Sequence, residues 1–324
     1  MPTQPDTVGG PTIGSDDLEP YRRELTGYCY RMLGSFFEAE DAVQETMVRG
    51  WRGIEGFEGR SALRSWLYRI ATNVCLDLLR GRERRALPVD LGPSSTADVT
   101  LGPMLPEHTW VQPIPDGRAL PDGDPAEVAV AKETIRLAFV TALQCLPARQ
   151  RAVLILREVL RWQATEVAEL LQASVASVNS ALQRARATLA ARDVGASPTP
   201  AMDADQQALL ARYVDAFERY DVDRLVTLLH ADAVMSMPPY DLWLRGPLEM
   251  GRWFLGQGHG CQGSRLVPTA ANGCAAFGSY RPDGQGGHLP HALQVIEIRG
   301  VRIVGHHNFL DPALFAAFGL PARL

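Results

Sequence analysis

The sequence has no long apolar run and no recognisable leader. No stretch of about 18 apolar residues occurs, and this excludes a membrane-spanning helix. Residues 1–17 are polar and acidic, without the basic start and apolar centre of a secretory signal. We therefore expect a cytoplasmic protein with no membrane partner, in which residues 1–17 form a disordered lead-in.

Cysteine is scarce and shows no pairing pattern. The five cysteines are odd in number and form no CxxC pair, which argues against a disulfide framework and against structural zinc. His288 and His291 lie close together with Pro290 between them, but no third ligand is identifiable. We expect no metal and no other cofactor.

Excess positive charge is also lacking, since the net charge is -5, and taken alone this argues against a nucleic-acid-binding protein. The charge is unevenly distributed, however. Residues 60–85 contain seven arginines against Asp77 and Glu83, a net charge of +5. Residues 132–192 contain nine basic and four acidic residues, again +5. Two basic segments in a mildly acidic chain favour a local nucleic-acid contact.

The 324 residues are too many for one typical domain, and the pattern changes along the chain. Helical periodicity predicts all-α domains at residues 18–87 and 126–192. Residues 88–125, dense in Pro, Gly and Asp, predict a flexible linker, and residues 193–202 a second one. Residues 203–324 predict an α+β domain, with two helices followed by short strands over 233–237, 264–269, 273–280, 292–299 and 301–309.

The sharpest local pattern lies at residues 165–189. A short helix over 165–171 is followed by a three-residue turn, and Ser174 can then cap a second helix. Val175, Val178, Leu182 and Ala185 form the apolar stripe of that second helix, and its opposite face is polar. This is the pattern of a helix-turn-helix, in which the second helix enters the major groove of DNA. An ordinary helical hairpin with a polar face is the alternative.

Taken together, the two helical segments resemble the sigma-70 family, specifically its extracytoplasmic-function group. The resemblance covers roughly 140 residues and is carried by EDAVQET ending at Trp51, by SALRSWLYRIATN from Ser61 and by DLLR from Asp77. In the second segment it is carried by LPARQR from Leu146, EVA from Glu166 and the helix over 178–186. The resemblance implies core RNA polymerase and promoter DNA as partners.

The resemblance assigns roles to three sets of residues. An acidic-polar helical face is expected to bind the polymerase clamp, and its residues are Asp41, Gln44, Glu45, Val48 and Trp51. The promoter -10 element is expected to contact Arg60, Ser61, Arg64, Asn73, Asp77, Arg80 and Arg84. Arg82, Arg84 and Arg85 are expected to bind its phosphates. The -35 element is expected to contact Ser174, Ala176, Ser177, Asn179, Ser180, Gln183, Arg184 and Arg186.

The chain departs from the family pattern in the helix-turn-helix. Gln172 stands in the turn where the family usually has glycine, and a positive φ there would cost about 1 kcal/mol. Asn179 and Ala181 replace residues that are often basic, so the promoter preference cannot be inherited from relatives.

The segment at 203–324 resembles SnoaL-like domains, which have the NTF2-like cone fold. The resemblance rests on four segments: YVDAF from Tyr213, LVTLLHADA from Leu225, MPP from Met237 and the strand over 303–311. Three uses of such a domain stay open: contact with the sigma domains, a small-molecule sensing pocket and catalysis. We expect the first use, regulation of a sigma factor in cis, and no enzyme. The alternative is a cone-fold ligand binder or an isomerase- or cyclase-like enzyme that uses the helical part for DNA targeting.

Overall fold

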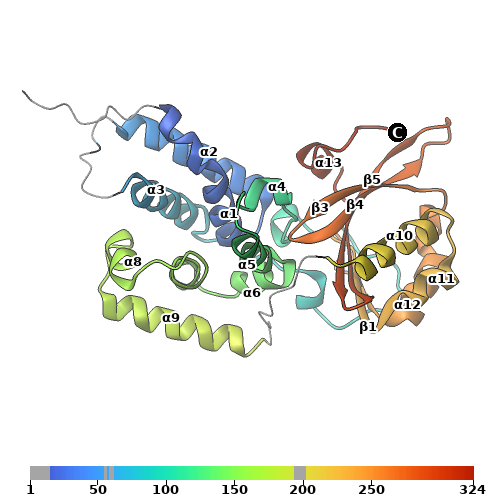
Figure 1. The fold of residues 1–324 in the computed structure, drawn as a ribbon. Helices are drawn as coiled ribbons and strands as arrows, with labels where there is room; N and C mark the ends of the chain where they lie inside the picture. Colours follow the sequence, from blue (N-terminus) through green and yellow to red (C-terminus); the bar gives the residue numbers. More distant parts are fainter. Residues whose placement is uncertain (1–14, 55–56, 58–61, 193–201) are drawn as a thin grey trace, which may run out of the picture.

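The computed structural model describes residues 15–54, 57, 62–192 and 202–324. An all-helical half and an α+β half lie side by side (Figure 1). None of the described helices is long and apolar enough to cross a membrane. The predicted order of two all-α segments followed by an α+β domain is confirmed.

The first helical block (residues 18–87) is built from three helices, α1 (Arg22–Leu33), α2 (Phe36–Gly53) and α3 (Leu63–Leu78), preceded by two 3-10 turns at Ser15–Asp17 and Glu19–Tyr21. Ser35 caps α2, because its side chain accepts a hydrogen bond from the backbone N–H of Glu38 at 3.3 Å. Ala62 stands at the cap position of α3 and makes no side-chain hydrogen bond, and Ser61 before it lies outside the described residues.

The second helical block (residues 126–192) contains α5 (Pro125–Ile135), α6 (Leu137–Gln144), α7 (Ala148–Leu154), α8 (Ala164–Leu170) and α9 (Val175–Ala190). A π-helical turn, η6 (Ile155–Val159), extends α7. Arg136, where ψ is 143°, separates α5 from α6. The break leaves the carbonyl of Ile135 free to accept a hydrogen bond from the C-terminal domain.

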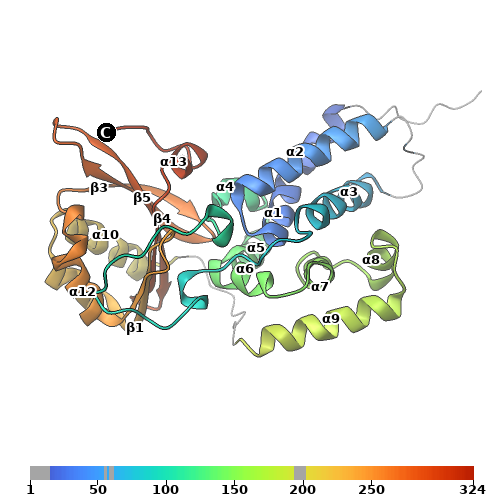
Figure 2. The same cartoon turned by 180° about the vertical axis from the view of Figure 1, so that it is seen from behind.

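Residues 88–125 contain only three short helical turns, at Pro88–Asp90, Glu107–Thr109 and α4 (Asp116–Ala119). The expected linker is thus present, but the structure differs from a free chain. The segment runs across the C-terminal domain, as Figure 2 shows. Trp110, Val111 and Ile114 are buried. Apolar side chains and backbone hydrogen bonds hold this linker in place, although its sequence shows no regular period.

The C-terminal domain (residues 203–324) is a curved six-stranded sheet with strand order β2-β1-β6-β5-β4-β3. Only the β1–β6 pair is parallel in this sheet. The strands are β1 (Leu229–Ser236), β2 (Trp243–Arg245), β3 (Arg265–Ala271), β4 (Cys274–Pro282), β5 (His288–Arg299) and β6 (Arg302–Phe309). The helices are α10 (Ala204–Glu218), α11 (Val222–Thr227), α12 (Gly246–Leu255) and α13 (Ala313–Ala317), with a 3-10 turn η7 (Gln257–Cys261).

Two apolar cores hold the molecule together, and the first of them crosses the domain boundaries. It joins both helical blocks to Ala271, Cys274 and Phe309 of the C-terminal sheet. The second lies inside the C-terminal domain, between the sheet and α10, α11 and α12, and includes Ala97 of the linker. The three parts of the chain are therefore packed as one body.

Candidate promoter- and polymerase-binding surfaces

The helix-turn-helix forms as its sequence predicts. Ser174 caps α9 by accepting a hydrogen bond from the backbone N–H of Ser177 at 3.1 Å. Val178, Leu182 and Ala185 are buried against α7 and α8. All eight predicted -35 contacts are exposed on the outer side of this unit, namely Ser174, Ala176, Ser177, Asn179, Ser180, Gln183, Arg184 and Arg186. The exposed surface of α9 thus offers hydroxyl, amide and guanidinium groups together.

The turn before α9 adopts a strained conformation at Gln172. Gln172 has a φ of 50°, in the left-handed region that favours glycine. The backbone N–H of Ala173 donates to the carbonyl of Ala168 at 2.9 Å, and Arg149 donates to the carbonyl of Leu171 at 3.2 Å. These bonds fix the geometry of the turn in spite of the missing glycine.

Two arginines of the predicted -35 surface have partners within the chain. Arg184 donates to the hydroxyl of Ser180 at 2.7 Å, one turn earlier on α9. Arg186 forms an ion pair with Glu158 of the π-helical turn. Both pairs are exposed, so each is easily exchanged for a phosphate.

The predicted -10 helix, α3, is covered on one side by the second helical block. Arg64 makes a two-oxygen ion pair with Glu24 at 2.9–3.0 Å, and its guanidinium lies over the rings of Tyr68 and Trp162, 5.2 and 5.6 Å from their centroids. The Tyr68 and Trp162 rings are themselves 5.1 Å apart. Arg69 pairs with Glu169 of α8 at 3.5 Å.

The other predicted -10 contacts are dispersed. Asn73, Asp77, Arg80 and Arg84 are exposed. Asp77 and Arg80 pair with each other at 3.0 Å, and Arg84 points a guanidinium nitrogen at the sulfur of Cys145, 3.1 Å away. Arg60 and Ser61 lie outside the described residues.

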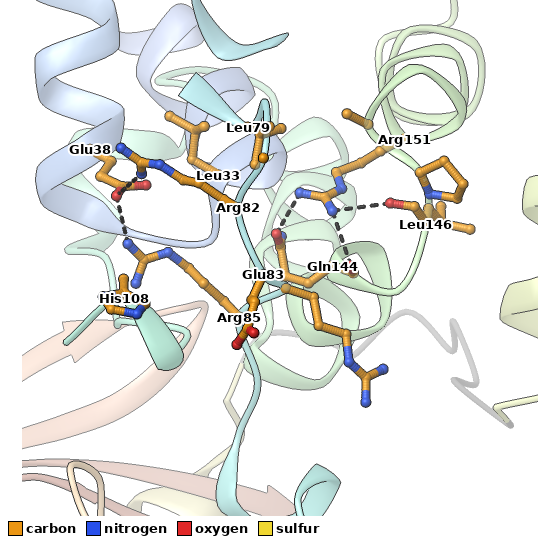
Figure 3. Close-up of a pocket in the computed structure, with 14 residues that line it drawn as sticks. Leu33, Glu38, Leu79, Arg82, Glu83, Arg85, His108, Gln144, Leu146 and Arg151 are labelled. Atoms are coloured by element: carbon orange, nitrogen blue, oxygen red, sulfur yellow. Dashed lines mark hydrogen bonds and ion pairs between the residues drawn. The ribbon is translucent and has the colours of Figure 1, made fainter. Parts of the chain in front are cut away.

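A cavity of about 580 Å³ separates the end of the first helical block from α7 (Figure 3). Glu38 lies on one wall and accepts from Arg82 at 2.5 Å and from Arg85 at 2.8 Å. Arg85 is buried and also donates to the carbonyl of Trp110 at 2.7 Å. The predicted phosphate contact by Arg85 is therefore wrong for this arrangement, because its guanidinium is used to fasten the linker.

Arg151 lies on the opposite wall of this cavity and is also buried (Figure 3). It donates to Gln144 Oε1 at 2.5 Å and to the carbonyls of Gln144 and Leu146 at 3.1 Å, and it bonds the carbonyl of Met32 in α1. Burial lowers the pKa of Arg151 to about 10, which leaves it charged at neutral pH. One buried cation thus ties α1 to the start of α7.

The predicted polymerase-binding face lies on α2. Asp41, Gln44 and Glu45 are exposed, Val48 is partly buried, and Trp51 is 60% exposed. The opposite side of α2 packs into the first core through Ala39, Ala42, Val43 and Met47. In Figure 1 this helix lies on the outer side of the helical half.

The C-terminal domain enters the helical half through the turn between β3 and β4. The side chain of Asn272 is fully buried there. Its amide nitrogen donates at 2.6 Å both to the hydroxyl of Tyr30 and to the carbonyl of Ile135, and its oxygen accepts from the N–H of Ile114 at 3.0 Å. One side chain therefore contacts both helical blocks and the linker.

Next to it, Gly273 has a φ of 72°, and its N–H donates to Asp116 at 2.7 Å. A Cβ at this glycine would lie 3.1 Å from the backbone oxygen of Lys132, so the turn approaches α5 closely. Sequence reasoning missed both residues as functional candidates. The Asn-Gly pair marks a hairpin turn, but nothing near it in the sequence identifies its distant partners.

The histidines of the C-terminal domain show no sign of a metal site. Among the described residues, no group of three or more His, Cys, Asp or Glu side chains could hold a metal ion. His306 is buried, lies 3.0 Å from the hydroxyl of Tyr213, and its pKa is lowered to about 3 by burial. An imidazole that stays neutral to so low a pH is a poor proton carrier near pH 7.

Comparison with known proteins gives the family of the chain. The sequence models of Sigma-70 region 2 and Sigma-70 region 4 match residues 18–85 and 136–189. ECF RNA polymerase sigma factor SigG of Mycobacterium tuberculosis is 47% identical over 315 residues, which cover 96% of this chain and 84% of the relative.

A second relative from the same organism, ECF RNA polymerase sigma factor SigJ, is 26% identical over 319 residues, 95% of each chain. Its crystal structure superposes with a TM-score of 0.60 at 23% identity over 94% of this chain and 99% of the other, which supports the same three-part fold. The two matched sigma regions and the near full-length likeness to SigG show that the chain belongs to the family of ECF RNA polymerase sigma factors.

Proposed function

We propose that the chain binds core RNA polymerase, directs it to specific promoters, and is regulated in cis by its C-terminal domain. The first two parts follow from the family, and the exposed surfaces of α2 and α9 support them. We also propose that it acts in the cytoplasm, where core polymerase is found, and that it is not an enzyme. The regulatory part rests on one observation, the burial of Asn272 between the two helical blocks.

The structure is a closed arrangement of the two DNA-binding blocks. Trp162 of the second block covers Tyr68 of α3, and Glu169 pairs with Arg69 on the same helix. Promoter DNA cannot reach this side of α3 while the second block lies on it. We therefore infer that opening must precede or accompany contact with the -10 element.

The C-terminal domain stabilises the closed arrangement. The fully buried Asn272 side chain makes three hydrogen bonds, and bonds of this kind contribute about 1 kcal/mol each. Ala271 and Cys274 on either side add apolar area to the shared core. The short tether at residues 193–202 raises the effective concentration of the domain, so modest contacts are sufficient.

The proposed polymerase-binding face of α2 is exposed in this arrangement. Core polymerase can therefore dock on Asp41, Gln44 and Glu45 before the two blocks separate. This order of events makes docking itself one source of the free energy for opening.

The test is a reconstituted transcription assay with core polymerase and a promoter from upstream of the chain's own gene. The full chain, a version truncated near residue 200, and the charge reversals Asp41→Arg and Glu45→Arg are compared. Each reversal should weaken core binding about tenfold, whereas Asp232→Arg, on an exposed position of β1, should not.

Truncation should change promoter output if the C-terminal domain regulates the factor. Equal output from the full and truncated chains would exclude regulation in cis. Absence of core binding by both would exclude the sigma function itself.

A further inference from the structure

A second cavity lies inside the C-terminal domain, between the concave side of the sheet and helices α10 and α12. Its volume is about 210 Å³. Most of its wall is apolar or aromatic, with Phe217, Met235, Trp253 and Phe254 among the lining residues. The proposed sigma function makes no use of this space.

Three polar side chains reach the same cavity from β4 and β5. Arg281 has a buried Nε with no hydrogen-bond partner among the described residues, and another of its nitrogens lies 3.1 Å from the sulfur of Cys261. Gln294 accepts a hydrogen bond from Tyr213 at 2.7 Å through its amide oxygen, which leaves its N–H groups available. His291 completes the set, and no acidic residue lines the cavity.

Burial and the nearby charge of Arg281 lower the pKa of His291 to about 4, so its ring is neutral at pH 7. The polar side of the cavity therefore offers hydrogen-bond donors and one positive charge. An orphaned buried donor calls for an explanation, and an oxygen acceptor on a bound molecule supplies one. The complementary group is a carboxylate.

One side of this cavity, its mouth, is formed by the linker. Leu101 is one of the lining residues and, with Val99, packs against the core of the C-terminal domain. Gln257, also in the cavity wall, donates to the carbonyl of Val99. The same linker joins the two helical blocks (Figure 2).

Backbone groups extend this attachment on both sides of Leu101. The N–H of Ala97 donates to Glu249 at 2.7 Å. The N–H groups of Ser95 and Leu105 donate to the carbonyls of Trp243 and Pro239, each at 2.8 Å.

We propose that the cavity binds a one- or two-ring organic carboxylate, and that the bound molecule displaces residues 97–105 from the mouth. A cavity of about 150 Å³ holds benzene, so this one accepts a slightly larger ring system, and more once Leu101 withdraws. Since a ligand and Leu101 occupy the same mouth, each weakens the binding of the other. As far as it concerns transcription, this inference rests on the proposed regulation in cis.

The test uses the full chain without polymerase, with 2-naphthoate as the probe and 2-naphthylmethanol as its uncharged counterpart. Calorimetry measures the dissociation constants. Hydrogen exchange follows the backbone amides of Ser95, Ala97 and Leu105. Binding of 2-naphthoate should speed exchange at these three amides and leave the amide of Val111 unchanged, because that amide bonds Ala86 outside the mouth.

Two variants distinguish the contribution of the binding site from that of the linker segment over it. Leu101→Ala should tighten 2-naphthoate binding about threefold or more, because the competing side chain is shortened. Met104→Ala is the matched control, since Met104 lies in the same segment and is 66% exposed. Arg281→Met should weaken 2-naphthoate about tenfold and leave 2-naphthylmethanol nearly unchanged.

No binding of 2-naphthoate, even to the Leu101→Ala chain, would overturn the site. Binding without faster exchange at the three linker amides would overturn the displacement. A separate transcription assay with core polymerase then adds 2-naphthoate. If the linker is released but promoter output is unaltered, the binding site and the displacement stand and the proposed regulation in cis is contradicted.

Discussion

The side-chain amide of Asn272 donates a hydrogen bond of 2.6 Å to the hydroxyl of Tyr30, 242 residues earlier in the chain. Burial raises the pKa of Tyr30 well above its usual range, so the hydroxyl stays protonated. It donates a hydrogen bond to the carbonyl of Gln112 at 2.8 Å. The pair can form only when the C-terminal domain and the first helical block are docked. It is therefore a direct marker of the closed arrangement.

Replacing Asn272 with glycine should open the molecule. Glycine accepts the φ of 54° at this position without strain, so the loss is confined to the three side-chain hydrogen bonds, about 3 kcal/mol in all. We expect a larger radius of gyration in small-angle scattering, and higher promoter output when the concentration of the sigma factor is limiting. Tyr30→Phe, which removes one of these bonds together with the bond from Tyr30 to Gln112, should give a smaller effect in the same direction. An unchanged radius in both variants would show that this turn does not hold the domains together.

The outer face of α9 should determine recognition of the -35 element. Asn179→Ala and Gln183→Ala should each cost about 1–3 kcal/mol at the preferred sequence and relax the preference at one base pair. Arg184→Ala should instead weaken binding to all sequences and reduce its salt dependence. Binding of the polymerase complex to a set of promoter variants at several salt concentrations separates the two effects. Equal losses on every sequence for Asn179→Ala would contradict a base contact by that residue.

Gln172→Gly should stabilise the chain. The left-handed φ of 50° costs a residue with a Cβ about 1 kcal/mol, and glycine removes this cost. Thermal unfolding should show a higher midpoint. Gln183→Gly, in the middle of α9, should lower the midpoint because glycine weakens a helix by about 1 kcal/mol. A lower midpoint for Gln172→Gly would mean that its side chain contributes more than the strain removes.

Stability should fall in mild acid. Burial lowers the pKa values of His291, His306 and His307, so between pH 6.5 and about 4 the unfolded chain binds more protons than the folded chain. Stability is therefore full above pH 6.5 and decreases below it, and His291 and His306 each contribute at most about 1.4 kcal/mol per pH unit to the decrease.

Urea unfolding of the full chain at pH 7, 6 and 5 measures this decrease. His306→Gln should flatten the profile, and His108→Gln, at an exposed position of the linker, should not. A profile for His306→Gln as steep as that of the unaltered chain would rule out the buried imidazole as its source.

The features predicted well from the sequence are those with a local period or a local motif. The 3.6-residue spacing predicted the orientation of α9 correctly for Val178, Leu182 and Ala185, whereas Val175 of the same predicted stripe is 39% exposed. Alternation in the last 120 residues or so predicted most of the strands. The contacts that join the domains have no such pattern. Val99 and Leu101 are two apolar residues in an irregular segment, and Arg85 sits in an arginine-rich run that equally suits phosphates. Their partners are far away in the sequence, so only the folded chain reveals their roles.

The linker, as bound to the C-terminal domain, also spans less than its fully extended length. Residues 88–125, at about 3.3 Å each, reach roughly 120 Å when fully extended. Promoter elements centred near -10 and -35 are about 25 base pairs apart, or roughly 85 Å along the DNA axis. The segment that runs across the C-terminal domain is therefore long enough for the two DNA-binding blocks to occupy both elements at once. It can extend to this length only when residues 95–105 dissociate from the C-terminal domain.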